Sequence, residues 1–223
     1  GLPNPDLAAI AEAAVLTTYS YLAYKSAESQ KSATTVSTIT IVSADARKAA
    51  AKKAVAEAVA VAEATCLARD WVNTPPADLR PPAFAEAIKD TAAKGVRVTI
   101  WDEKRLAKEN CGGILGVGAG SQAPPRLVKL SYNPAGAKTH LALVGKGITF
   151  ASGGLSLKPG NSRMTMKCDM GGAAAIVNDG AGLEAGETVS HHFRRWSGAG
   201  GARRGARDGT VGGVRAVIEL PCG

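Results

Sequence analysis

An alanine-rich stretch from Asp45 to Val72 constrains the fold of this chain more than any other segment. Alanine has the highest helix propensity of all residues, and Ser43 can cap the start of a helix. Residues 73–76, Asn-Thr-Pro-Pro, must end it, because proline donates no backbone hydrogen bond and restricts the residue before it. The sequence therefore predicts a long helix within residues 45–74, which we interpret as a connector between two domains.

The residues before this helix predict a shorter helix and a strand. Asn4 and Pro5 favour a helix start, and an apolar face continues from there to Leu16. Residues 25–33 are polar and are expected to form a loop. Residues 34–42 (TTVSTITIV) are almost all β-branched and are expected to form the strongest strand of the chain. The start at a glycine without Met indicates a piece of a longer protein.

Helical and strand patterns alternate after the two prolines. A glycine-rich run separates the first expected strand from the second. This alternation predicts an α/β layer in which helices cover a sheet. The expected helices are residues 82–94, 105–110 and 171–177, the glycine-rich run is 112–121, and the expected strands are 96–101, 126–132 and 140–144.

Overall composition excludes several classes of protein. Apolar residues at 45% and charged residues at 21% exclude wholesale disorder. No apolar run approaches the roughly 20 residues that span a bilayer, so no membrane partner is expected. The four cysteines form no CxxC pair, which argues against a disulfide framework or a zinc ribbon and favours buried thiols in a reducing cytoplasm. The net charge of +8 fits either nucleic-acid binding or simply a basic surface.

Residues 178–223 differ in composition from the rest of the chain. They contain 11 of the 26 glycines and no lysine, and no apolar period runs through them before Val211. Two interpretations remain open: an out-of-frame end of a GC-rich gene, or a native Gly/Arg-rich linker or RNA-binding tail. Both predict an irregular tail that is poor material for a core. His191 and His192 within it are interpreted as solvated rather than as metal ligands.

Glycine and lysine residues concentrate between residues 144 and 159. Four glycines there let the backbone approach another group closely, and Lys146 and Lys158 lie among them, with Asp169 following. This pattern indicates an anion site, such as one for phosphate, or a purely structural loop, and it lacks the spacing of a P-loop. A lysine in such a site either loses its proton and acts as a ligand or keeps it and acts as an electrophile.

Several longer motifs occur in order along the chain: VNTPP at 72–76, GILGVGAGS at 113–121, GKGITF and SGG within 145–154, and DMGGAAA at 169–175. With them, residues 5–177 resemble the leucyl aminopeptidase family, the cytosolic two-metal aminopeptidases. The resemblance implies an α/β fold in four parts. These are the C-terminal part of a small N-terminal α/β domain (1–44), a connector helix (45–74), an incomplete catalytic domain (75–177) and the irregular tail (178–223).

The same resemblance implies a chemistry. Family members use two divalent metal ions, such as Mn or Zn, to release N-terminal residues, often Leu, from peptides, and they are usually homo-hexamers in the cytoplasm. Within the motifs, Lys146 and Asp169 match metal ligands. Lys158 matches the catalytic lysine that stabilises the oxyanion, and Met166 matches a residue lining the substrate pocket.

Two departures from the family pattern predict a loss of function. Ala151 stands where the family has an aspartate that bridges both metals, and residues 178–223 contain no NTDAEGR motif, which supplies further carboxylates. Lys146 and Asp169 alone cannot hold two cations against hydration and mutual repulsion. The sequence therefore predicts a chain that does not retain the metals and is inactive. The alternatives are a non-catalytic DNA-binding accessory role, which basic residues would suit, and a non-functional remnant.

Overall fold

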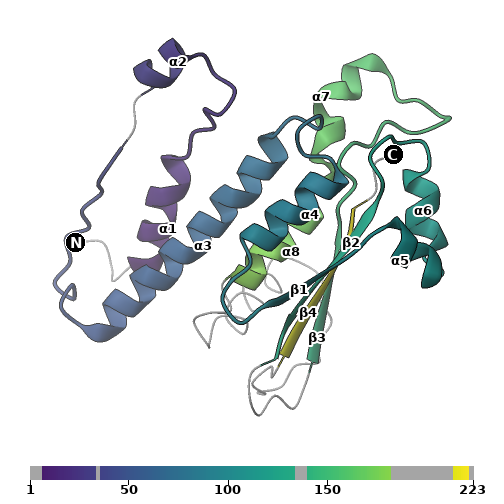
Figure 1. Ribbon diagram of the computed structural model, residues 1–223. Coiled ribbons are helices and arrows are strands. Elements are labelled where there is room, and N and C mark those ends of the chain that lie inside the picture. The colour runs from purple at the N-terminus through teal and green to yellow at the C-terminus, as the bar shows by residue number, and fades with distance from the viewer. Residues whose placement is uncertain (1–6, 34–35, 134–139, 182–212, 221–223) are drawn as a thin grey trace. The chain divides into compact units, whose positions relative to one another are not determined.

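The chain divides into two compact units, and the division falls within one helix. The computed structural model describes residues 7–33, 36–133, 140–181 and 213–220 (Figure 1). The first unit comprises Gly1–Asp70 and the second comprises Trp71–Gly223. None of the helices in these described segments is both long enough and apolar enough to cross a membrane.

The first unit contains α1 (Leu7–Thr17), α2 (Ala27–Ser32) and most of α3 (Ala49–Asn73). Side chains from α3 hold the end of α1. Tyr19 donates a hydrogen bond of 2.8 Å to Asp70 Oδ1, and Arg69 Nη1 donates one of 3.0 Å to the Leu16 carbonyl. The Arg69 guanidinium also lies over the Tyr19 ring, 5.4 Å from its centroid. Since Leu16 lies in the last turn of α1, Arg69 pairs a carbonyl that the helix itself leaves open.

Two expectations for residues 25–42 are wrong. Residues 36–42, the described part of the expected strand 34–42, form no regular structure, and Val42 is 92% exposed. A strand needs a neighbour to take up its backbone hydrogen bonds, and the described residues of the first unit supply none. The expected loop at 25–33 instead contains α2, because Ser26 caps it by accepting a hydrogen bond from the Ser29 amide.

The second unit is built around a four-stranded sheet with the order β1-β2-β4-β3 (Figure 1). The pair β1 and β2 is antiparallel, β2 and β4 are antiparallel, and β3 and β4 are parallel. Three strands fall where the alternation predicts them. The bounds are Arg97–Trp101 for β1, Arg126–Tyr132 for β2, His140–Lys146 for β3 and Gly213–Leu220 for β4.

Strand β4 corrects the expectation that residues 178–223 are an irregular tail. It lies in the middle of the sheet, with Val217 opposite Lys129 of β2 and opposite Val144 of β3. The physical reason is that β2 and β3 each present backbone groups that need a partner, and the apolar run after Val211 can supply one. Residues 182–212 and 221–223, which include His191 and His192, lie outside the described residues.

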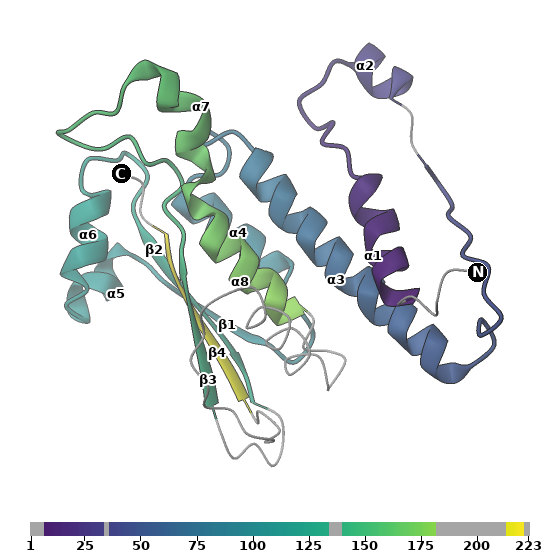
Figure 2. The ribbon, with the colours of Figure 1, turned by 180° about the vertical axis from the view of Figure 1, so that it is seen from behind.

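Helices α4 (Pro81–Asp90) and α8 (Gly171–Ala181) cover one face of the sheet in both views (Figures 1 and 2). Phe84 and Ile88 of α4 and Val128 of β2 are completely buried. The Phe84 ring meets the Trp71 indole edge-on, with the ring centroids 5.2 Å apart. This contact joins α4 to the end of α3, so Trp71 belongs to the core of the second unit.

Helices α5 (Glu103–Lys108) and α6 (Gly112–Gly118) pack against the opposite face, where Leu106, Ile114 and Leu127 form a buried cluster. Leu127 and Val128 are neighbours on β2 and therefore point to opposite faces. The glycine-rich run thus forms a short helix, since Ile114 buries its side chain in this cluster.

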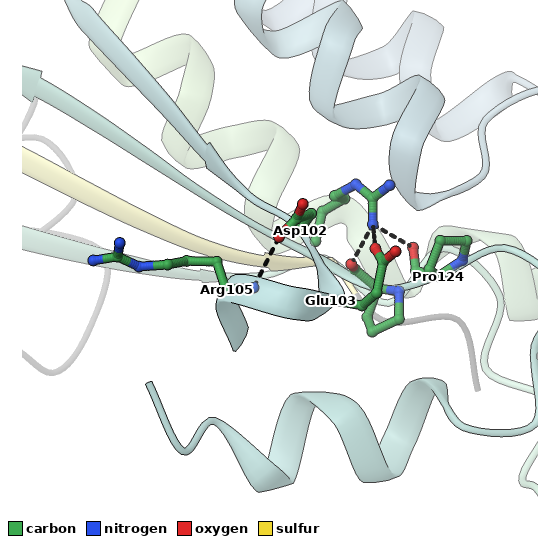
Figure 3. Close-up of polar contacts among 6 residues, drawn as sticks. Asp102, Glu103, Arg105 and Pro124 are labelled. Atoms are coloured by element: carbon green, nitrogen blue, oxygen red, sulfur yellow. Dashed lines mark hydrogen bonds and ion pairs between the residues drawn. The ribbon is translucent and has the colours of Figure 1, made fainter. Parts of the chain in front are cut away.

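Polar contacts fix α5 at the start of β2 (Figure 3). Asp102 caps α5 by accepting a hydrogen bond of 2.8 Å from the Arg105 amide. Arg126 Nη1 donates to Glu103 Oε2 at 2.7 Å and to the Pro125 carbonyl at 2.9 Å. Because Arg126 is the first residue of β2, these contacts hold the helix and the strand end together.

Candidate active site

The candidate site lies where β3 ends against α8. A Cβ atom on Gly145 would come within 2.9 Å of Ala173 Cα, closer than real Cβ atoms approach, and within 3.1 Å of Ile176 Cδ1. A Cβ on Gly172 would come within 3.4 Å of the Lys146 carbonyl oxygen. Glycine at position 145 therefore lets the strand lie directly on the start of the helix, and Lys146 follows it at this contact.

Lys146 and Asp169 form an ion pair. Asp169 lies in η2 (Lys167–Met170), just before α8, and its Oδ2 contacts Lys146 Nζ directly. The Lys146 and Asp169 side chains are 57% and 35% exposed, so the pair is partly open to solvent. The structure therefore brings together the two residues predicted as metal ligands, and it does so as an ammonium paired with a carboxylate.

The loop after β3 carries Lys158 and is closed by backbone hydrogen bonds. The Lys158 amide donates to the Ser152 carbonyl at 2.9 Å, and Gly153 adopts a φ of +98°. A Cβ on Gly153 would come within 2.4 Å of the Ser156 carbonyl oxygen, so only glycine fits this turn. Among the described residues, no hydrogen bond or ion pair brings the Lys158 ammonium to Lys146 or Asp169.

Position 151 is fixed next to the segment that carries Asp169. The Ala151 amide donates a hydrogen bond of 3.0 Å to the carbonyl of Met166, the last residue of α7 (Arg163–Met166). Met166 is 4% exposed, so its side chain lies in the core, and its role in a substrate pocket stays a prediction. Thr149, which the sequence analysis did not single out, is buried with no hydrogen-bond partner for its Oγ1.

The described residues do not fit a centre for two cations. Nowhere in the described segments do three or more His, Cys, Asp or Glu side chains group as metal ligands. Position 151 offers a methyl group, and the Asp169 carboxylate is already paired with Lys146. A pair of divalent ions needs several oxygen or nitrogen donors.

Cys168 differs from the sequence-based expectation, and the contact of Lys167 was not predicted. The thiol of Cys168 is exposed, so the expected buried thiol is wrong there, whereas burial raises the pKa of the half-buried Cys66 thiol. Lys167 Nζ donates a hydrogen bond to the Val72 carbonyl. The sequence gives no signal for that contact, because it joins residues 95 positions apart.

Known proteins with similar sequences carry one family name. The family model described as "Cytosol aminopeptidase family, catalytic domain" matches residues 66–186, more than half of the chain. A probable cytosol aminopeptidase of Streptomyces avermitilis is 63% identical over 111 residues, which is 49% of this chain and 21% of the relative. One from Micrococcus luteus is 47% identical over 184 residues, which is 80% of this chain and 36% of the relative.

Solved structures give the same result for the fold. The bottromycin maturation enzyme BotP in complex with Mn matches 97% of this chain and 40% of its own, with 37% identity and a TM-score of 0.74. Cytosol aminopeptidase from Coxiella burnetii matches 96% of this chain and 39% of its own, with 26% identity and a TM-score of 0.68. The chain thus spans about a fifth to two fifths of the length of these relatives and has the fold of a partial α/β catalytic domain. The resemblance in its motifs is confirmed, and the chain belongs to the cytosol aminopeptidase family.

Proposed function

We propose that this chain carries part of the catalytic domain of a metallo-aminopeptidase that releases N-terminal residues, with Leu preferred, from peptides in the cytoplasm. The observation that supports this most is the family match over residues 66–186, which contains every residue of the candidate site. The names of the relatives, probable cytosol aminopeptidase, support the location and the reaction class.

In this proposal the site residues keep the roles that their motif positions suggest. Lys146 and Asp169 stand at the metal-ligand positions, and Met166 stands at the pocket. Lys158 is the catalytic lysine, whose ammonium would donate hydrogen bonds to the oxygen of the scissile carbonyl as negative charge develops there. Its exposed position and its freedom from any ion pair among the described residues leave the ammonium available to a substrate.

We also propose that a polypeptide of these 223 residues does not hold the metal pair and does not hydrolyse peptides. With alanine at position 151 the bridging carboxylate of the family is absent, and the Asp169 carboxylate is paired with the Lys146 ammonium. The parts 1–44, 45–74 and 75–177, and assembly as a homo-hexamer, stay predictions. For the DNA-binding alternative no support comes from the compared proteins, whose names mention no nucleic acid.

The test is hydrolysis of leucine p-nitroanilide with added Mn²⁺, together with metal content by mass spectrometry. We expect no turnover above background and no stoichiometric metal, because the described ligand set is too small. The full-length relative from Streptomyces avermitilis serves as the positive control.

Ala151→Asp is the matched variant for this test. Restoring one carboxylate beside the Met166 segment should raise Mn²⁺ affinity measurably while leaving turnover at background, since the remaining carboxylates are still missing. Turnover by the natural sequence with about two metal ions per chain would contradict the proposal and would require ligands from residues 182–212 or 221–223.

A further inference from the structure

Lys167 contacts the end of a helix that lies far from it in sequence. It is the first residue of η2, and its Nζ donates a hydrogen bond to the carbonyl of Val72, in the last turn of α3. The last carbonyls of a helix have no intrahelical donor, and the negative end of the helix dipole favours a cation there. Lys167 therefore caps α3.

This helix end is a fixed point within the second unit. Trp71 packs edge-on against the fully buried Phe84 ring at 5.2 Å. A Cβ on Gly171, the first residue of α8, would lie 3.9 Å from Val72 Cγ2, so the start of α8 lies directly against Val72. A side chain that binds the Val72 carbonyl is therefore anchored to the core of the second unit.

The lysines on either side of Asp169 contact different partners. Lys146, at the end of β3, contacts the Asp169 carboxylate itself. Lys167 lies two residues before Asp169 and contacts Val72 instead. Two contacts therefore fix the short η2 segment. Lys146 pairs with its Asp169 carboxylate, and the Lys167 side chain links it to the end of α3.

We propose that Lys167 is a positioning residue for the candidate site: by capping α3 at Val72 it fixes η2 and so sets Asp169 against Lys146. The proposal rests on the proposed function only in taking Lys146 and Asp169 as the site. A lysine suits this position because its ammonium carries three donors and a full positive charge on a long, flexible stem. A residue without a donor at 167 would leave the Val72 carbonyl partly buried and unpaired.

The test measures the Lys146–Asp169 ion pair rather than turnover. The ammonium groups are observed by NMR in protein labelled with ¹⁵N-lysine, and the Lys146 signal is assigned by its loss in Lys146→Arg. In Lys167→Met we expect the Lys146 signal to move to the position of an unpaired, solvated lysine. In Lys167→Arg we expect it to stay, because the guanidinium can donate to the same carbonyl.

Lys89→Met is the matched control. Lys89 forms an exposed ion pair with Glu86 at 2.8 Å within α4, so removing it deletes a charge and an ion pair that involve neither Val72 nor Asp169. The Lys146 signal should not change in this variant.

An unchanged Lys146 signal in folded Lys167→Met would overturn the proposal, and so would equal losses in Lys167→Met and Lys89→Met. If Lys167→Met does not fold, Lys167→Ser is measured instead, because its polar side chain tolerates solvent but ends too close to the backbone to reach the Val72 carbonyl; an unchanged Lys146 signal in that variant would overturn the proposal equally. Because the readout is an ion pair, a failure of the proposed aminopeptidase function would show in the turnover assay and leave this result standing.

Discussion

Replacing Val217 of β4 by proline is expected to lower the free energy of unfolding by about 3 kcal/mol or more. Val217 lies in the fifth position of an eight-residue strand with a neighbour on each side, Lys129 on β2 and Val144 on β3. Its amide therefore faces a strand whichever way it points. Proline removes that donor and leaves a carbonyl unpaired inside the sheet, and its ring pushes the strands apart.

Val217→Ala is the control for this prediction, because it keeps the backbone amide and shortens only the side chain. Urea unfolding followed by circular dichroism gives the two free energies, and light scattering reports aggregation through the exposed edges of β2 and β3. We expect Val217→Pro to be far less stable than Val217→Ala and to aggregate. Equal stability of the two variants would mean that residues 213–220 do not pair in the middle of the sheet.

Local sequence patterns predicted the positions of several elements of the second unit and the end of the long helix. The strand at 126–132 matches β2 at both ends, and β1 begins one residue later than expected. The long helix was expected to begin near Asp45 and begins at Ala49, whereas its end at Asn73 follows directly from the prolines. Propensity, capping and proline restriction act within a few residues, which is why the sequence carries this information.

Elements that depend on distant partners could not be predicted in this way. The β-branched residues 36–42 form no strand, because the described part of the first unit offers no strand for them to pair with. Residues 213–220 form a strand because they can pair with β2 on one side and β3 on the other. The β-propensity of a residue says how well its side chain fits a half-buried sheet surface. It does not supply the neighbouring strands that make up that surface.

In the candidate site, too, the residues could be predicted from local sequence but their contacts could not. Lys146, Lys158 and Asp169 could be singled out because glycine and charged residues cluster around them, and their roles came from a family resemblance. Their geometry was not accessible: the pairing of Lys146 with Asp169 and the contact of Lys167 with Val72 join residues 23 and 95 positions apart. Only the packing of β3, η2 and the end of α3 brings these groups together.

Replacing Gly145 by valine is expected to cost about 3 kcal/mol and to separate the Lys146–Asp169 ion pair. Overpacking a core usually costs about 1–3 kcal/mol, and here the added Cβ would lie 2.9 Å from a backbone atom, Ala173 Cα, which cannot turn aside as a side chain can. The start of α8 must therefore move away from β3. Since η2 directly precedes α8, Asp169 must move with it.

Gly116→Ala in α6 is the matched control, because no atom lies within 4 Å of the Cβ it would add and the residue lies within a helix. Removing a helical glycine should stabilise the chain by about 0.5–1 kcal/mol. Urea unfolding checks both free energies, and the Lys146 ammonium signal reports the ion pair. If Gly145→Val kept both its stability and that signal, β3 and α8 would not be in contact at Gly145, and Lys146 would owe its place beside Asp169 to something other than this glycine. A loss of the signal with a smaller loss in Gly145→Ala would instead show that the close approach of strand and helix is what places the pair.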